Sequence, residues 1–236
     1  MPEAIVITPV KDSPTTTQRT IEAVCKSDCE LEYYVYNDFS LNETKELLDQ
    51  MSQKYPVTVI HLEDITNTPS PNYKLVLNMA QNMAIEKQLP LIIIESDVII
   101  QPGTISNLLK ITKENKKPGL VGAITVGTNG EYNFPYNFEK TKSRQTITTS
   151  HSLSFCCTVL TIPFLQTFSF EELPSEKDWY DVTISRQSRK LGFNNYLAKG
   201  IEVLHLPHSS RPWKNLKYSN PVLYYFKKIT QKRDRI

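Results

Sequence analysis

The sequence lacks the short motifs that identify several common enzyme classes. No GxGxxG follows the first predicted strand, which argues against a dinucleotide-binding enzyme. No GxxxxGK[ST] is present, which argues against a P-loop protein. A serine hydrolase would need GxSxG at a strand–helix junction, and that motif is missing too.

Long apolar runs are also missing. No uninterrupted apolar stretch approaches the roughly 20 residues of a transmembrane helix, and the N-terminal MPEAIVITPV has no basic leader. We therefore expect neither a membrane span nor a signal peptide. The four cysteines, at positions 25, 29, 156 and 157, form no recognisable metal or disulfide pattern, so we expect reduced thiols in a cytoplasmic protein.

Basic residues are in excess only at the C-terminal end. Residues 209–236 hold eight Lys or Arg and one Asp, a net charge of +7, which leaves −5 for residues 1–208 because the whole chain carries +2. An acidic body argues against nucleic-acid binding. The tail mixes aromatic residues such as Trp213 and Phe226 with its lysines. This mixture suits an anionic membrane surface, and the alternative, which we favour slightly, is a solvated basic helix or a partner-binding tail. We expect one domain over 1–208 and a separate tail.

Hydrophobic patterning predicts an α/β fold. Short β-branched runs predict strands at 4–10, 31–38, 57–62 and 91–96, and helices are predicted between and after them, at about 14–24, 40–55, 73–88 and 102–114. This alternation is typical of a doubly wound, mainly parallel sheet flanked by helices. Beyond residue 115 the pattern becomes mixed. It predicts a strand at 119–126, a hairpin turn at Asn129-Gly130, a strand near 152–160, a helix at 175–192 and two short strands after it.

Polar residues follow three of the predicted parallel strands, at the sheet edge where ligands gather. Glu95, Ser96 and Asp97 interrupt an apolar run after the fourth strand. The two acids could serve as turn residues, or they could bind a divalent cation such as Mg²⁺ or Mn²⁺. Asp38, after the second strand, could form an Asx-turn or accept a hydrogen bond from a base-ring N–H such as that of uracil.

Three further residues are candidates for chemistry. Asp181 lies near the start of the helix predicted at 175–192, where it is either a general base or a charge that favours the helix dipole. His205 and His208 follow the last predicted strand. Either histidine could complete a metal site built mainly from Asp97, or it could be a partly exposed residue in a turn.

Five segments in order resemble family 2 of the inverting glycosyltransferases. They are IVITPVKD, VYNDFS, AQNMAIEKQLPLIIIESDV, WYDVTISRQSRKLG and VLHLPHSS, and they run from about residue 4 to 210. The resemblance implies the GT-A fold, with a nucleotide-binding half over about 1–115 and an acceptor half over about 116–208. Three residues depart from the family pattern: Glu95 replaces the first Asp of DxD, Tyr180 replaces the Glu of Glu-Asp, and Phe39 replaces the Gly of DDGS.

The same resemblance implies a role for each candidate residue. It assigns nucleotide binding to Pro9, Val10, Asp38, Asn82, Glu95 and Ser96. It assigns the metal, Mg²⁺ or Mn²⁺, to Asp97 with His205 or His208, and the general base to Asp181.

The implied activity is metal-dependent transfer of a sugar from a nucleotide diphosphate donor to a hydroxyl of a glycan or a lipid-linked acceptor. The expected donor is a UDP-sugar, and the transfer inverts the configuration at the anomeric carbon. A cytoplasmic enzyme that meets the inner face of the membrane through its tail fits this activity. Two alternatives are a catalytically silent nucleotide- or carbohydrate-binding member of the same fold and a sugar nucleotidyltransferase. The second would normally carry a glycine-rich loop after the first strand, where this chain has PVKDSPTTTQRT.

Overall fold

The computed structural model describes residues 1–136, 139, 142–175, 179–206, 222–223 and 225–226. The chain divides into two compact units, Met1–Leu206 and Pro207–Ile236. All the elements below belong to the first unit. Among the described residues, no helix is both long enough and apolar enough to cross a membrane.

The elements follow the predicted order, with additions. The strands are β1 (Ala4–Val10), β2 (Leu31–Asn37), β3 (Thr58–His61), β4 (Leu91–Ile94), β5 (Val98–Ile99), β6 (Pro118–Val126), β7 (Thr146–Thr148), β8 (Cys157–Leu160) and β9 (Asn194–His205). The helices are α1 (Pro14–Val24), α2 (Asn42–Lys54), α3 (Tyr73–Lys87), α4 (Thr104–Glu114), α5 (Ile162–Thr167) and α6 (Tyr180–Lys190), with short 3₁₀ turns η1 (Leu62–Asp64) and η2 (Phe170–Glu172).

The strands form one mixed sheet in the order β3-β2-β1-β4-β8-β6-β9-β5, and β7 pairs with β9. The first four strands in this order are parallel to one another. Strand β8 runs antiparallel to both β4 and β6, and β5 and β7 run antiparallel to β9. The predicted α/β class is confirmed: among the described residues, a parallel portion of four strands continues into a mixed portion of five strands in one sheet.

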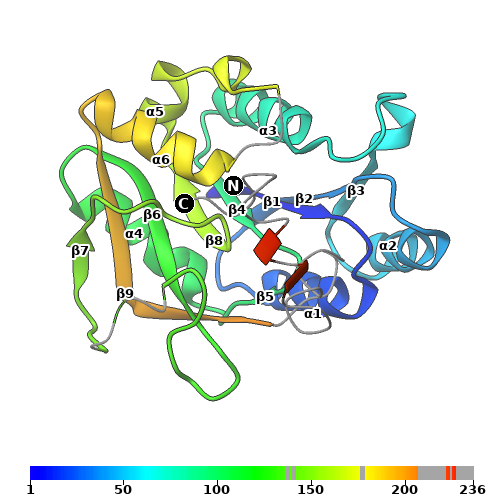
Figure 1. Cartoon of the computed structure of the whole chain (residues 1–236), viewed down its shortest axis with the longest axis horizontal. Coiled ribbons are helices and arrows are strands. Elements are labelled where there is room, and N and C mark those ends of the chain that lie inside the picture. The colour runs from blue at the N-terminus through cyan, green and yellow to red at the C-terminus, as the bar shows by residue number, and fades with distance from the viewer. Residues whose placement is uncertain (137–138, 140–141, 176–178, 207–221, 224, 227–236) are drawn as a thin grey trace. The chain divides into compact units, whose positions relative to one another are not determined.

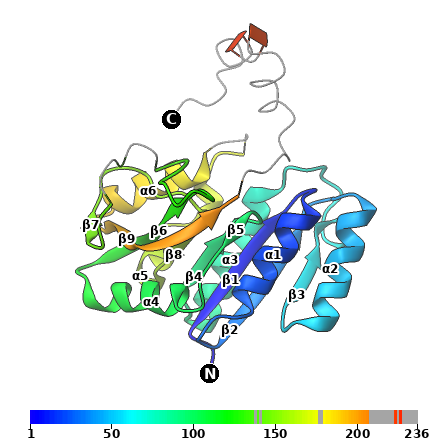
Figure 2. The same ribbon diagram turned by 90° about the horizontal axis from the view of Figure 1, so that it is seen from below.

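The two faces of the sheet build two apolar clusters. Alternation along β1 sends Val6 to one face and Ile5 and Ile7 to the other. Helices α1, α2 and α4 pack on the Val6 face, and α3, α5 and α6 pack on the opposite face. Figures 1 and 2 show α3, α5 and α6 together on one side of the sheet and α1 and α4 on the other. The result is a three-layer α/β/α arrangement that buries both faces of the parallel strands.

The end of the sheet differs from the prediction of two short strands near residue 200. The segment is one long strand, β9, whose pairing with β6 shifts between Ala198 and Glu202. The residues in between bulge out of the pairing with β6. Gly200 lies so close to the backbone of Arg144 that a Cβ at position 200 would stand 2.7 Å from the carbonyl oxygen of Arg144. In a sequence, a glycine among charged residues is typical of a turn, but in β9 these residues form a β-bulge. Helix α6 also begins later than predicted, at Tyr180, and part of the predicted first turn lies outside the described residues.

Candidate active site at the carboxyl edge of the sheet

The parallel strands bring the first predicted site residues to one edge. Because β2 and β4 both run parallel to β1, the ends of the three strands lie side by side. Pro9 and Val10 end β1, and Val10 is 1% exposed. The backbone N–H of Asp38 donates to the carbonyl oxygen of Val10 at 2.9 Å, which fixes the exit from β2 against the exit from β1.

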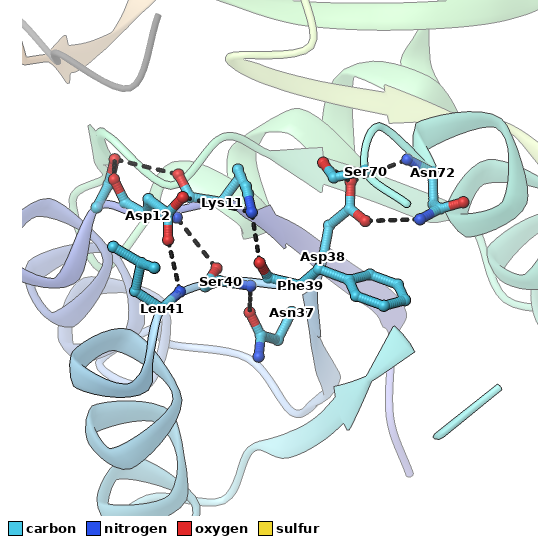
Figure 3. A network of polar contacts seen from close by, with 10 residues as sticks. Lys11, Asp12, Asn37, Asp38, Phe39, Ser40, Leu41, Ser70 and Asn72 are labelled. Atoms are coloured by element: carbon cyan, nitrogen blue, oxygen red, sulfur yellow. Dashed lines mark hydrogen bonds and ion pairs between the residues drawn. The ribbon is translucent and has the colours of Figure 1, made fainter. Parts of the chain in front are cut away.

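The carboxylate of Asp38 organises the approach to helix α3 (Figure 3). It accepts hydrogen bonds from the Ser70 hydroxyl at 2.8 Å and from the backbone and side-chain N–H groups of Asn72 at 2.9 and 2.8 Å. Asn72 is the N-cap of α3, and its side chain also donates to the carbonyl oxygen of Thr68 at 2.9 Å. Asp38 therefore holds the loop before α3 to the end of β2, a role that an Asx-turn alone would not have.

The residue that replaces the family glycine adopts a glycine-like conformation. Phe39 has φ +55°, in the left-handed region that costs a residue with a Cβ about 1–2 kcal/mol. Polar contacts around the turn hold this conformation (Figure 3): Lys11 donates to the carbonyl oxygen of Phe39, and the backbone N–H of Asp12 donates to the Ser40 hydroxyl at 3.0 Å. The Asp12 carboxylate in turn accepts from the backbone N–H of Leu41 at 2.7 Å.

Glu95 lies against the thiol of Cys156, the residue just before the antiparallel strand β8. Ile94 pairs with Cys157, and just beyond this pair the backbone N–H of Glu95 donates to the carbonyl oxygen of Cys156 at 3.2 Å. The Cys156 thiol donates to the Glu95 carboxylate, with Sγ and Oε2 3.2 Å apart. Burial, followed by the charge of Glu95, raises the pKa of this thiol well above its usual value. The thiol is therefore protonated when no cation is bound.

Asp97 lies beside His205 because the short strand β5 pairs with the end of β9. Val98 is in register with His205, and the backbone N–H of Leu206 donates to the carbonyl oxygen of Asp97 at 2.9 Å. Asp97 is 2% exposed, and its Oδ2 lies 3.4 Å from Nε2 of His205. Nδ1 of His205 donates to the carbonyl oxygen of Phe134 at 2.9 Å, which leaves Nε2 directed at the carboxylate.

The protonation of His205 follows from these neighbours. Burial lowers the pKa of the imidazole, but the hydrogen bond and charge of Asp97, the charge of Glu95 and the Phe134 carbonyl raise it further, so the net direction is upward. Two carboxylates thus act on one imidazole. Positive charge at this point is favoured, whether it is carried by a proton or by a cation.

The donors at this point have the chemistry of a cation site. One ligand atom each from Glu95, Cys156 and His205 lies within 4.8 Å of the other two. Asp97 adds a buried carboxylate beside the same imidazole. Carboxylate oxygens suit Mg²⁺ and Mn²⁺, and imidazole and thiolate suit transition metals, so the residues fit a divalent cation.

Asp181 belongs to the helix layer formed by α3, α5 and α6. It lies in the first turn of α6, half-buried, and its Oδ1 accepts from the backbone N–H of Val182 at 2.9 Å. Burial raises the pKa of the Tyr136 hydroxyl, the hydrogen bond from the Ser154 N–H lowers it, and the negative charge of Asp181 adds to the rise. The same Tyr136 hydroxyl accepts from the backbone N–H of Ser154, two residues before Cys156.

The remaining predicted residues are less closely connected to the cluster. Ser96 lies in the turn between Glu95 and Asp97 and is half-buried. Asn82 lies on α3 with its side chain exposed, while its neighbour Gln81 is buried and donates to the carbonyl oxygens of Leu165 and Phe168. His208 lies outside the described residues.

The family model for glycosyl transferase family 2 matches residues 5–164, more than half of the chain. The chain belongs to glycosyl transferase family 2. This confirms the resemblance inferred from the five sequence segments. Among curated proteins, none matches the sequence.

Solved structures share the GT-A fold of this family 2 chain. The mannosyltransferase PcManGT from Pyrobaculum calidifontis, in complex with GDP-Man and Mn²⁺, has a TM-score of 0.67 at 14% identity, over 97% of this chain and 64% of its own. S. aureus TarS 1-349 has a TM-score of 0.65 at 16% identity, over 86% of this chain and 60% of its own. TarS in complex with UDP-GlcNAc has a TM-score of 0.64 at 16% identity, over 88% of this chain and 59% of its own. The chain therefore spans roughly 60% of the length of these proteins.

Two residues that the structure places near the candidate site, Cys156 and Tyr136, were not identified from the sequence. Cys156 gives no sequence signal, because its spacing from the other cysteines matches no metal motif. Tyr136, 1% exposed, accepts a hydrogen bond from the backbone N–H of Ser154 at 3.0 Å, and it lies in a stretch for which the sequence predicts no helix or strand. Both contacts depend on how separate segments pack together, and no local signal in the sequence reveals them.

Proposed function

We propose that this family 2 chain is a metal-dependent inverting glycosyltransferase with a nucleoside diphosphate sugar as donor. A UDP-sugar is the donor that we propose first. The observation that carries this is the position of Asp38, Glu95, Asp97 and His205 along one edge of the sheet. Ligands of open α/β sheets gather at this edge. The ligands bound in the similar structures, GDP-Man with Mn²⁺ for PcManGT and UDP-GlcNAc for TarS, are of the proposed donor class.

The donor base would bind at the ends of β1 and β2. An ionised carboxylate offers about four acceptor positions, and Asp38 uses three of them for Ser70 and Asn72. One position remains for a base-ring N–H, as the proposal for uracil requires. Pro9 and Val10 would flank the base, and Ser96 and Asn82 remain proposed nucleotide contacts.

The diphosphate would lie beside the donor cluster. Asp97, with Glu95 and His205, would hold a divalent cation, for which Mg²⁺ and Mn²⁺ are the proposed ions and His208 remains a proposed ligand. When bound, such an ion offsets the negative charge that develops on the leaving diphosphate. The sheet would hold the two carboxylates in place, because Glu95 directly follows strand β4 and Asp97 directly precedes strand β5.

Asp181 is the proposed general base. A carboxylate at the start of α6 can take the proton of an acceptor hydroxyl while that oxygen attacks the anomeric carbon, and a single displacement inverts the configuration. Acid–base catalysis of this kind contributes about 10²–10⁴-fold to the rate. We expect Asp181→Asn to lower the release of UDP from UDP-sugars by that factor while the dissociation constant for UDP with Mn²⁺ stays within about twofold.

The experiment measures UDP release from a panel of UDP-sugars in the presence of Mn²⁺, with and without candidate hydroxyl acceptors. Asp64→Asn is the matched control, because Asp64 is an exposed aspartate in η1. Unchanged UDP release in Asp181→Asn would reject the assignment of the base. Thermal-shift measurements with UDP, GDP and their sugar conjugates would identify the nucleotide.

A catalytically silent binding member is the second candidate, and Tyr180 is the observation that favours it. This residue stands where the family has the Glu of Glu-Asp, is 6% exposed, and donates its hydroxyl to the carbonyl oxygen of Pro174 at 3.0 Å. It thus has a structural role in place of a charged one. Nucleotide binding without release of UDP from any sugar conjugate would support this second candidate.

The acceptor is proposed to be a glycan or a lipid-linked hydroxyl compound, met at the inner face of a membrane. The basic, aromatic composition of residues 209–236 supports this proposal. Among the described residues of that tail, Val222 and Phe226 are exposed.

A further inference from the structure

A thiol is built into the proposed cation site. Sγ of Cys156 lies 3.2 Å from Oε2 of Glu95, and the Ser154 hydroxyl donates to the same sulfur at 3.2 Å. The backbone of Cys156 is fixed as well, since its N–H donates to the Ser154 hydroxyl at 3.3 Å and its carbonyl oxygen accepts from the N–H of Glu95 at 3.2 Å. The sulfur is therefore held toward the carboxylate from several directions.

The adjacent cysteine shows that burial alone does not produce this arrangement. Cys157 is 0% exposed, belongs to strand β8, and packs in the same apolar cluster as Cys156. Burial is the cause that raises its pKa to about 12. Cys156 differs because the strand pairing places it beyond the end of β4, opposite the acidic turn.

The distances suit one ion. Bonds of about 2.0–2.3 Å that meet at a tetrahedral angle place two ligand atoms of Zn²⁺ about 3.3–3.8 Å apart. Three donor atoms lie within 4.8 Å of one another: a carboxylate oxygen of Glu95, the sulfur of Cys156 and a ring nitrogen of His205. Movements of these atoms by about 1 Å, through side-chain rotation, would bring all three within bonding distance of one ion. His205 is oriented as metal-ligating histidines usually are, with its other ring nitrogen donating to the carbonyl oxygen of Phe134 at 2.9 Å.

We propose that Cys156 is a ligand of the divalent cation together with Glu95 and His205, and that this soft donor makes the site prefer Zn²⁺ or Co²⁺ to Mg²⁺. On binding, the S–H bond of Cys156 breaks, its proton passes to solvent, and a sulfur–metal bond forms with no change of oxidation state. Thiolate and imidazole donors favour later transition metals, and Mg²⁺ favours oxygen donors. The inference rests on the proposed function for its biological meaning, but the metal site can be tested without any sugar donor.

The test is a titration of the full metal-free chain with Co²⁺, in which a thiolate ligand produces a sulfur-to-cobalt charge-transfer absorption band. We expect the band in the unmodified chain and in Cys157→Ser, which is the matched control, and we expect its loss in Cys156→Ser. Competition with Zn²⁺ and Mg²⁺ gives the affinities. Loss of one ligand should weaken Zn²⁺ binding by about tenfold or more and leave Mg²⁺ binding within about threefold.

Each outcome decides the proposal. Absence of the band in the unmodified chain would overturn it, and so would a band of full intensity in Cys156→Ser, which would assign the sulfur ligand to another cysteine. Far-ultraviolet circular dichroism confirms folding of each variant, and Cys156→Ala replaces the serine variant if that one does not fold. Isothermal titration with UDP and Mg²⁺ tests the proposed function separately, since failure to bind UDP would leave the cobalt band in place.

Discussion

Replacement of Asp38 by alanine tests whether this carboxylate is a structural anchor as well as a nucleotide contact. In the absence of nucleotide, the side chain accepts three hydrogen bonds, one from Ser70 and two from Asn72. Asp38→Ala leaves those donors in place without their acceptor. Asn72 is 7% exposed, so its N–H groups cannot be fully compensated by water.

The expected loss can be estimated from these contacts. A hydrogen bond to a charged group contributes about 1.5–3 kcal/mol, and the lower end applies here because Asp38 itself is only half-buried. The two bonds from Asn72 then give about 2–3 kcal/mol, while the Ser70 hydroxyl can turn to solvent. For a domain of this size, each kcal/mol lowers the melting temperature by about 2–4 °C, so we expect a decrease of roughly 4–12 °C.

A double-mutant cycle with Asn72→Ala separates the side-chain contact from the rest. Chemical denaturation gives the free energy of unfolding of the unmodified chain, the two single variants and the double variant, all without nucleotide. The bond between Asn72 Nδ2 and Asp38 Oδ1, 2.8 Å long, predicts a coupling energy of about 1 kcal/mol. Asp64→Ala, at an exposed site, should change the stability by less than about 0.5 kcal/mol.

An Asp38→Ala chain as stable as the unmodified one would refute this reasoning. The carboxylate would then serve the nucleotide alone, and the loop before α3 would be held by other contacts. A loss of stability with no measurable coupling to Asn72 would place the effect elsewhere in the turn around Phe39.

Two further predictions concern pH and the tail. In the metal-free chain the pKa of His205 is raised from 6.5 by Asp97 and Glu95. The stabilising contribution of the protonated imidazole is therefore complete below pH 6.5 and is lost as the pH rises through the folded-state pKa. Denaturation at several pH values should show this decrease in the free energy of unfolding, and His205→Gln should make that free energy less dependent on pH. Flotation with vesicles rich in phosphatidylserine should carry the full chain upward and leave a chain cut after His208 in the soluble fraction, and equal recovery of the two would remove the membrane contact.

Many of the strands and helices could be predicted from the residue types in short stretches of the sequence. The β-branched run at 4–10 and the proline at position 14 predicted strand β1 and the start of helix α1 at the residues where they occur. The same logic failed at β9, where Gly200 and its charged neighbours resemble a turn. A bulge and a turn use the same residue types, and only the pairing of β9 with β6 distinguishes them. That pairing is a long-range property, which periodicity in a short window does not contain.

The candidate site was predictable to the extent that it lies at the ends of parallel strands. Asp38 and the Glu95–Asp97 turn could be placed because the carboxyl ends of such strands share an edge whatever the rest of the fold does. His205 reaches Asp97 only because β5 pairs with β9, and Cys156 reaches Glu95 only because β8 runs antiparallel to β4. The parallel portion of the sheet thus supplies the acids, and the mixed portion supplies the nitrogen and sulfur donors. In the proposed site, the type of cation that binds would therefore be decided by the part of the fold that sequence patterns predict least well.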